Sequence, residues 1–145
     1  LVWDSRYAAE RWLAEHVPAG ALVGTNGEGV YLPRVPVSLR TVRAEVTAEG
    51  LAFEGGVPDW VVLSDAYYAR YLRRPATRPV LARLLADDPE WARVASFHSP
   101  HLVATNLIPS MNPRIVVLRR VGQAATTPAA ACSSRNASSI ATTNS

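Results

Sequence analysis

Apolar residues follow two different spacings along the first 121 residues of the chain. In residues 4–17, 64–73 and 77–86 they recur three and four positions apart, which predicts three amphipathic helices. Asp4 or Ser5 is expected to cap the first of these helices, because short polar side chains accept hydrogen bonds from the first free backbone N–H groups.

Short apolar runs between these segments predict β-strands. The strongest is Trp-Val-Val-Leu-Ser at residues 60–64, a continuous apolar run of the kind found where both faces of a sheet are covered. Residues 21–24, 90–98 and 114–121 are predicted as further strands, and residues 30–32 are expected to be extended.

Residues 35–46 fit two interpretations. Their apolar positions alternate, then slip in phase after residue 39 and alternate again. A bulged strand gives this pattern, and so does a strand followed by a short helix.

The order of these elements predicts an α/β fold. We expect a small layered sandwich with a mixed, mostly parallel sheet, helices on its faces and an antiparallel C-terminal edge pair. The last two strands form that pair, because no helix is predicted between them. Residues 1–121 are predicted to be one domain. Residues 122–145 are rich in Ala, Thr and Ser and are expected to be a disordered low-complexity tail.

Composition removes several classes of function. All fifteen basic residues are arginine, but they are scattered and face twelve acidic residues, so no nucleic-acid partner is expected. The single cysteine, Cys132, cannot form an intrachain disulfide or a thiolate metal site. No apolar run approaches the roughly 20 residues of a membrane-spanning helix. Because the chain begins with leucine, we expect it to be part of a longer protein.

The glycine-rich stretch Gly-Thr-Asn-Gly-Glu-Gly follows a predicted strand, as a phosphate-binding loop does. Its spacing is the reverse of the dinucleotide fingerprint, and the next residues, Val-Tyr-Leu-Pro, do not start a helix that could meet a phosphate. We therefore predict a simple turn in which Asn26-Gly27 adopts positive φ.

His98 and His101 flank Pro100, which disfavours a helix that would align the two imidazoles. Both are expected to be surface-loop residues, and neither a metal site nor a cofactor is predicted.

Ser64 and Asp65 end the strongest predicted strand, where open α/β sheets bind ligands. Two interpretations remain: both residues cap the following helix, or Asp65, Tyr67 or Tyr68 contacts a ligand. A hydrolase that uses Ser64 or Asp65 is the least supported option, since the G-x-S-x-G elbow is absent.

The same helix carries an aromatic and cationic cluster. If its tyrosines pack on the sheet, its arginines are simply solvated; otherwise the cluster is a docking surface for a sugar, lipid headgroups or a membrane domain. The residues of this cluster are Tyr67, Tyr68, Arg70, Tyr71, Arg73 and Arg74.

Three stretches together resemble a known family. They are WDSRYAAERWLAEHVPAGALVG (residues 3–24), VPDWVVLSDAYYARYLRRP (57–75) and FHSPHLVATNLIPSMNPRIVVLRR (97–120). In this order they are similar to the segment after the last transmembrane helix of bacterial membrane glycosyltransferases of the dolichyl-phosphate-mannose protein mannosyltransferase type (family 39) and their aminoarabinose-transferase relatives. The resemblance covers residues 3–121 and includes no catalytic signature.

The resemblance implies a soluble α/β domain on the extracytoplasmic, periplasmic face of the bacterial inner membrane. In such proteins a transmembrane bundle binds a polyprenyl-phosphate sugar, and the catalytic acid lies in an early extracytoplasmic loop. This chain would then hold no catalytic residue. Its expected partners are the transmembrane portion of the same polypeptide, the acceptor and lipid headgroups. The alternative is a free-standing α/β module that binds a nucleotide or another anionic small molecule at the strand ends.

Overall fold

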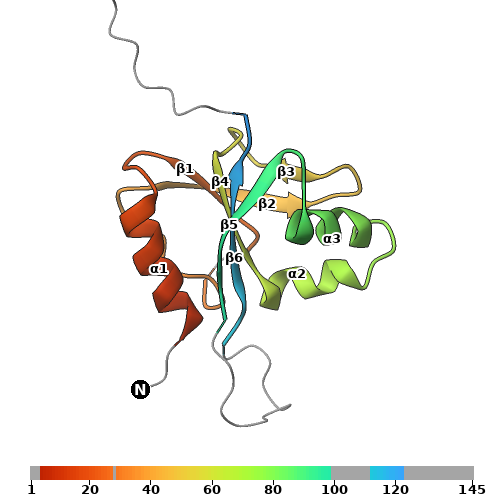
Figure 1. Cartoon of the computed structure of the whole chain (residues 1–145), viewed down its shortest axis with the longest axis horizontal. Helices are drawn as coiled ribbons and strands as arrows, with labels where there is room; N and C mark the ends of the chain where they lie inside the picture. The colour runs from red at the N-terminus through yellow and green to blue at the C-terminus, as the bar shows by residue number, and fades with distance from the viewer. Residues whose placement is uncertain (1–3, 28, 99–111, 123–145) are drawn as a thin grey trace, which may run out of the picture.

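The computed structural model describes residues 4–27, 29–98 and 112–122. These residues form three helices and one six-stranded sheet (Figure 1). The helices are α1 (Ser5–His16), α2 (Asp65–Leu72) and α3 (Arg78–Ala86). The strands are β1 (Leu22–Thr25), β2 (Arg40–Val46), β3 (Leu51–Phe53), β4 (Trp60–Ser64), β5 (Trp91–Phe97) and β6 (Ile115–Arg120).

The sheet has the strand order β3-β2-β1-β4-β6-β5. Its centre is parallel, because β1 pairs in parallel with both β2 and β4. Antiparallel pairs flank this centre: β3 on β2 at one side, and β6 on β4 followed by β5 on β6 at the other. The predicted fold class is confirmed, including the antiparallel pair of the last two strands.

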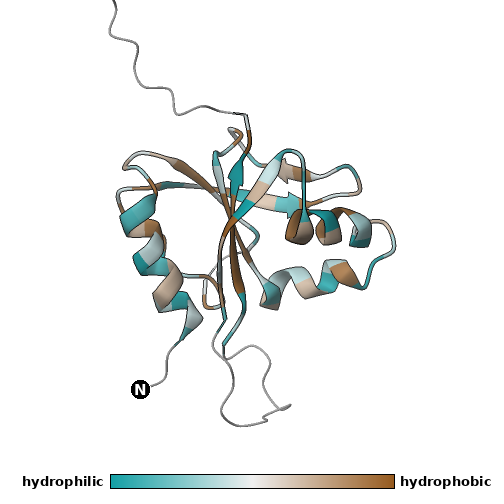
Figure 2. Ribbon diagram, in the orientation of Figure 1, coloured by the Kyte–Doolittle hydropathy of each residue, from teal (hydrophilic) through white to brown (hydrophobic). Residues whose placement is uncertain are grey.

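Helices cover both faces of the sheet. Figure 1 shows α1 on one side and α2 with α3 on the other. Strand β4 is buried along its whole length, as its continuous apolar run predicts. Val61 and Leu63 pack in the core beneath α2 and α3, whereas Trp60 and Val62 pack in the core on the α1 side. Figure 2 shows the matching pattern, with hydrophobic strands at the centre and mixed surfaces on the helices.

Helix caps follow the predictions in part. Asp4 caps α1 by accepting a hydrogen bond from the Arg6 N–H at 2.9 Å. Ser64 occupies the N-cap position of α2, but its side chain makes no capping hydrogen bond. Thr77 occupies the N-cap position of α3, but its side chain makes no capping hydrogen bond, and its hydroxyl donates to the Tyr71 carbonyl. Capping by the Ser64 hydroxyl was therefore a wrong expectation.

The segment between β1 and β4 also differs from the predictions. Residues 30–32 form a turn rather than an extended piece, with the Leu32 N–H donating to the Gly29 carbonyl. Neither interpretation of residues 35–46 holds, since a turn at residues 37–38 leads directly into β2. Strand β3 was not predicted, because three residues are too few to show an alternating pattern.

None of the helices among the described residues is both long enough and apolar enough to span a lipid bilayer. The predicted tail from residue 122 onward lies outside the described residues, except for Gly122.

Candidate functional site

The carboxyl ends of β1 and β4 lie side by side at one edge of the sheet, which we call the carboxyl edge. The two strands are parallel neighbours, and the chain leaves β1 for β2 on one side while β4 lies on the other. Such a point of divergence is where open α/β sheets place their ligands. The residues at the strand ends are Asn26 after β1 and the pair Ser64–Asp65 at the end of β4.

Asn26 joins the two strand ends. Its side-chain oxygen accepts a hydrogen bond from the Ser64 N–H at 3.0 Å, and its side-chain nitrogen donates to the Ser64 carbonyl at 3.3 Å. The asparagine is only 4% exposed. Its side chain therefore links β1 to β4 beyond the last residue pair of their backbone ladder.

The Ser64–Asp65 pair leaves two polar atoms without partners. The Ser64 hydroxyl oxygen and one Asp65 carboxylate oxygen, Oδ1, are buried and have no hydrogen-bond partner among the described residues. Ser64 is completely buried, and the alternation along β4 places its side chain on the α1 side of the sheet. Leaving a buried polar group unpaired costs about 1–3 kcal/mol. The Ser64 hydroxyl and Asp65 Oδ1 therefore differ from the Asn26 side chain, which has a partner for both its oxygen and its nitrogen.

The glycine-rich stretch at the end of β1 packs against the aromatic ring of Tyr67. A side chain on Gly27 would meet the ring of Tyr67 at 2.7 Å, so glycine is required there by contact. The predicted positive φ at Asn26-Gly27 was wrong, because neither residue has one. The positive φ of this turn falls at Gly29, with a value of 82°. Tyr31 packs edge-on against Tyr67, with 5.6 Å between ring centroids.

The first turn of α1 is fixed to the segment that precedes β6. Because β6 is antiparallel to β4, it starts at the carboxyl edge. The Ser5 N–H and hydroxyl both donate to Asn112 Oδ1, at 3.0 and 2.8 Å, and the hydroxyl also contacts the Pro113 carbonyl oxygen. Ser5 is 2% exposed. The Asp65 N–H donates to the Arg114 carbonyl at 3.0 Å, which adds the start of α2 to the same edge.

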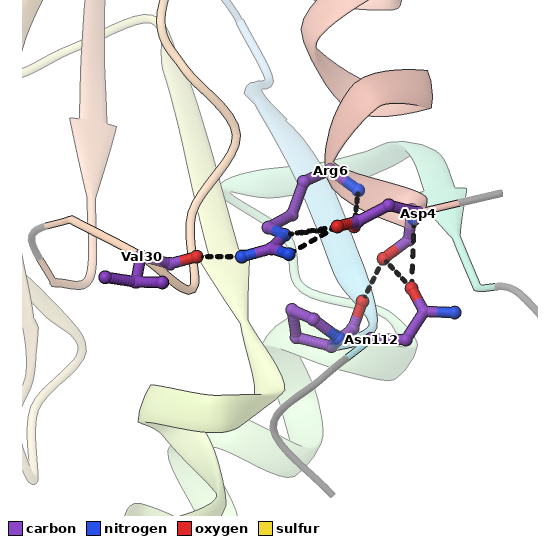
Figure 3. Close-up of polar contacts among 6 residues, drawn as sticks. Asp4, Arg6, Val30 and Asn112 are labelled. Carbon is purple, nitrogen blue, oxygen red and sulfur yellow. Dashed lines mark hydrogen bonds and ion pairs between the residues drawn. The ribbon is translucent and has the colours of Figure 1, made fainter. Parts of the chain in front are cut away.

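Asp4 and Arg6 complete this arrangement (Figure 3). Both carboxylate oxygens of Asp4 accept hydrogen bonds from Arg6, and the far end of the guanidinium donates to the Val30 carbonyl oxygen. Burial alone would raise the pKa of the Asp4 carboxyl, but the hydrogen bonds and charge of Arg6 outweigh it and hold the pKa below its usual value. We call the linked residues the junction: Asp4, Ser5, Arg6, Val30, Asn112 and Pro113.

A cleft of about 440 Å³ lies beside the junction, within the size range of small-molecule sites. Asp4 and Arg6 form part of its wall, but they are already paired with each other. Tyr7 and Val30 line it with mostly exposed side chains, 64% and 74% accessible. The remaining lining residues are Glu10, Gly29, Leu32 and Arg34.

The aromatic and cationic cluster of α2 is divided by the structure. Tyr68 and Tyr71 are each 5% exposed and belong to the core beneath α2 and α3. Tyr68 is therefore a core residue, and burial raises the pKa of its hydroxyl, with the Asp65 charge acting in the same direction. Tyr67 and Asp65 are half-buried at the carboxyl edge.

The three arginines of the cluster, Arg70, Arg73 and Arg74, are exposed and lie apart from the Ser64–Asp65 pair along α2. The candidate residues therefore belong to two places, the carboxyl edge and the outer surface of α2. The long-range bonds of Asn26, and of Ser5 to Asn112, were missed, since no local pattern marks a polar residue that bonds to a segment 38 or 107 positions away.

Across residues 4–27, 29–98 and 112–122, no three histidine, cysteine or acidic side chains gather closely enough to hold a metal ion. His98 lies just after β5, and His101 falls outside the described residues.

Comparison of the chain with known proteins finds no matching family model, no matching curated protein and no matching solved structure.

Proposed function

We propose that this chain is the extracytoplasmic C-terminal accessory domain of a polytopic membrane glycosyltransferase that uses a polyprenyl-phosphate sugar donor. The domain itself is non-catalytic. It covers the membrane-embedded active site or positions the acceptor, and its partner is the transmembrane portion of the same polypeptide.

One observation carries this proposal: the three stretches that resemble the glycosyltransferase family meet at the carboxyl edge. Ser5 of the first stretch bonds to Asn112 of the third, and Asp65 of the second bonds to Arg114 of the third. These hydrogen bonds give the polar residues of the three stretches a common role, which is to hold the stretches together in the fold. This supports a resemblance of the folded unit rather than three unrelated matches.

The position of α1 agrees with this proposal. Its first turn lies in the junction, so a transmembrane helix preceding Asp4 would enter the domain at the carboxyl edge. Figure 1 shows α1, α2 and β6 all beginning on this side of the molecule. The cleft beside Arg6 would then face the membrane-embedded part of the enzyme.

The coding sequence upstream of Leu1 tests the proposal first. We expect several transmembrane spans, the last ending shortly before Asp4, and an acidic residue in an early extracytoplasmic loop. Membranes that contain the full-length protein should then transfer labelled sugar from a polyprenyl-phosphate donor. An upstream region without spans, or full-length protein inactive with every polyprenyl-phosphate sugar tried, would refute the proposal.

A second candidate function is a small-molecule site at the ends of β1 and β4. The buried, unpaired Ser64 hydroxyl and Asp65 Oδ1 favour it. Because a carboxylate oxygen only accepts hydrogen bonds, the ligand must donate them, which fits a sugar hydroxyl better than a nucleotide phosphate.

Backbone NMR of the chain with D-mannose and with inorganic phosphate tests this second candidate. We expect mannose to shift the Ser64 and Asp65 amide signals, and Ser64→Ala to abolish the shift. The matched control is Ser38→Ala, at an exposed serine, which should leave the shift intact. Shifts with phosphate alone would instead favour an anion site, and no shift with either probe would remove the candidate.

A further inference from the structure

The positive charge of the chain is concentrated in one segment. Residues 66–86, which include α2 and α3 beyond Asp65, contain five arginines and no acidic residue. The rest of the chain has ten arginines and twelve acidic residues, so the net charge of +3 arises entirely from this segment. Five of the fifteen arginines, with no acidic residue among them, therefore gather on one helical layer of the fold.

Four of these five arginines have no carboxylate to neutralise them. Arg83 pairs with Asp88 at 2.6 Å. The other four are exposed, and no ion pair joins them to an acidic residue in the part of the chain that the structure describes. We call these four residues the arginine face: Arg70, Arg73, Arg74 and Arg78.

The buried ring of Tyr71 supports two side chains of the arginine face. The guanidinium groups of Arg70 and Arg74 lie over the ring of Tyr71, at 4.9 and 5.6 Å from its centroid. Tyr71 is only 5% exposed, so its ring is a fixed support. The Arg78 N–H donates to the Arg74 carbonyl at 2.9 Å, which ties the start of α3 to the end of α2. Arginines held in this way lose less conformational freedom when they meet an anionic surface.

We propose that the arginine face binds the anionic headgroups of a lipid bilayer. Exposed arginines without acidic neighbours are attracted to anionic lipid, and each contributes roughly a fivefold gain in binding. Leu72, which is 37% exposed between Arg70 and Arg73, adds an apolar contact at the bilayer surface.

Nucleic acid fits the arginine face less well. Binding of single strands relies on exposed aromatic rings that stack with bases. The aromatic residues beside these arginines, Tyr68 and Tyr71, are buried. The lipid proposal depends on this charge distribution and not on the glycosyltransferase assignment, so either can fail without the other.

Co-sedimentation of the full chain with lipid vesicles tests the proposal. We expect binding to vesicles of phosphatidylglycerol and phosphatidylcholine, little binding to phosphatidylcholine alone, and weaker binding as salt is raised. The triple variant R70Q/R73Q/R74Q should lower the partition coefficient by about 100-fold. The single variant R73Q, at an arginine that does not contact Tyr71, should lower it by about fivefold and covers the case in which the triple variant misfolds.

The matched control is R11Q/R40Q/R43Q, which removes the same charge from exposed positions on α1 and β2. It should bind anionic vesicles far more tightly than the first triple variant does. Equal losses in the two triple variants would contradict the proposal, because they would indicate a general charge effect. Absence of binding to anionic vesicles would contradict it as well. So would tighter binding to a single-stranded oligonucleotide, which would identify nucleic acid as the partner.

Discussion

At the junction, Asp4 neutralises the charge of Arg6, and the Arg6 guanidinium also donates to the Val30 carbonyl. On the arginine face, by contrast, Arg70, Arg73 and Arg74 have no carboxylate partner among the described residues. The chain thus uses the same side chain in two ways. The bonds of Arg6 to Asp4 and to the Val30 carbonyl hold the first turn of α1 in place, so the role of the junction is structural. An unpaired guanidinium at the surface loses little and is available to a partner. Pairing, rather than residue type, separates the two roles.

Within the carboxyl edge, the same contrast separates Asn26 from the Ser64–Asp65 pair. Asn26 uses both ends of its amide, while the neighbouring hydroxyl and carboxylate oxygen have no partner. Substitutions at the paired sites should therefore change stability, and those at the unpaired sites should change binding.

Asn26→Ala is expected to have the largest effect on stability. It removes the bridge between β1 and β4 and leaves the buried Ser64 N–H without its partner, while the Ser64 carbonyl keeps the first hydrogen bond of α2. We expect the free energy of unfolding to fall by about 1–3 kcal/mol in urea titrations. Asn112→Ala, at the junction, serves as a comparison. A loss within experimental error for Asn26→Ala would show that the amide bridge is not needed.

Asp4→Ala is expected to have an intermediate effect. It removes a helix cap and the partner of Arg6, for a loss of about 1–2 kcal/mol at neutral pH. Because Arg6 holds the pKa of Asp4 below its unfolded value, the carboxylate stabilises the fold fully above about pH 4.

That stabilisation should be lost as the pH falls through the folded pKa of Asp4. The difference in unfolding free energy between wild type and Asp4→Asn, which keeps an acceptor for the cap, should therefore shrink below about pH 4. A difference that stays constant down to pH 2 would contradict the ion-pair account.

Ser64→Ala should have the smallest effect on stability, and in the opposite direction. It removes a buried hydroxyl that lacks a partner, so the free energy of unfolding should stay the same or rise by up to about 1 kcal/mol. The matched control is Ser5→Ala, which removes a buried hydroxyl that has partners and should destabilise the fold. If Ser64→Ala destabilises the chain as much as Ser5→Ala does, the Ser64 hydroxyl is satisfied in solution and the contrast fails.

Much of the fold follows from local patterns. The periodicity of α1 and the continuous apolar run of β4 were enough to locate both elements, because each is long or uniformly buried. Strand β3 and the turn before β2 were missed, since three residues or a single phase slip have no distinct pattern.

The candidate site was less predictable because its links are non-local. The position of Ser64 and Asp65 could be predicted from the strand-to-helix boundary. The role of Ser5 could not, since it depends on Asn112, more than 100 positions away. The division of the α2 tyrosines also depends on neighbours: Tyr67 meets Gly27, while Tyr68 and Tyr71 enter the core.

Deletion of residues 4–121 from the full-length membrane glycosyltransferase that we propose, followed by measurement of sugar transfer in membranes, tests the central claim most directly. The account predicts that the truncated protein still inserts but transfers sugar more slowly or to a different set of acceptors. Transfer at the wild-type rate to the same acceptors would contradict the role proposed for this domain.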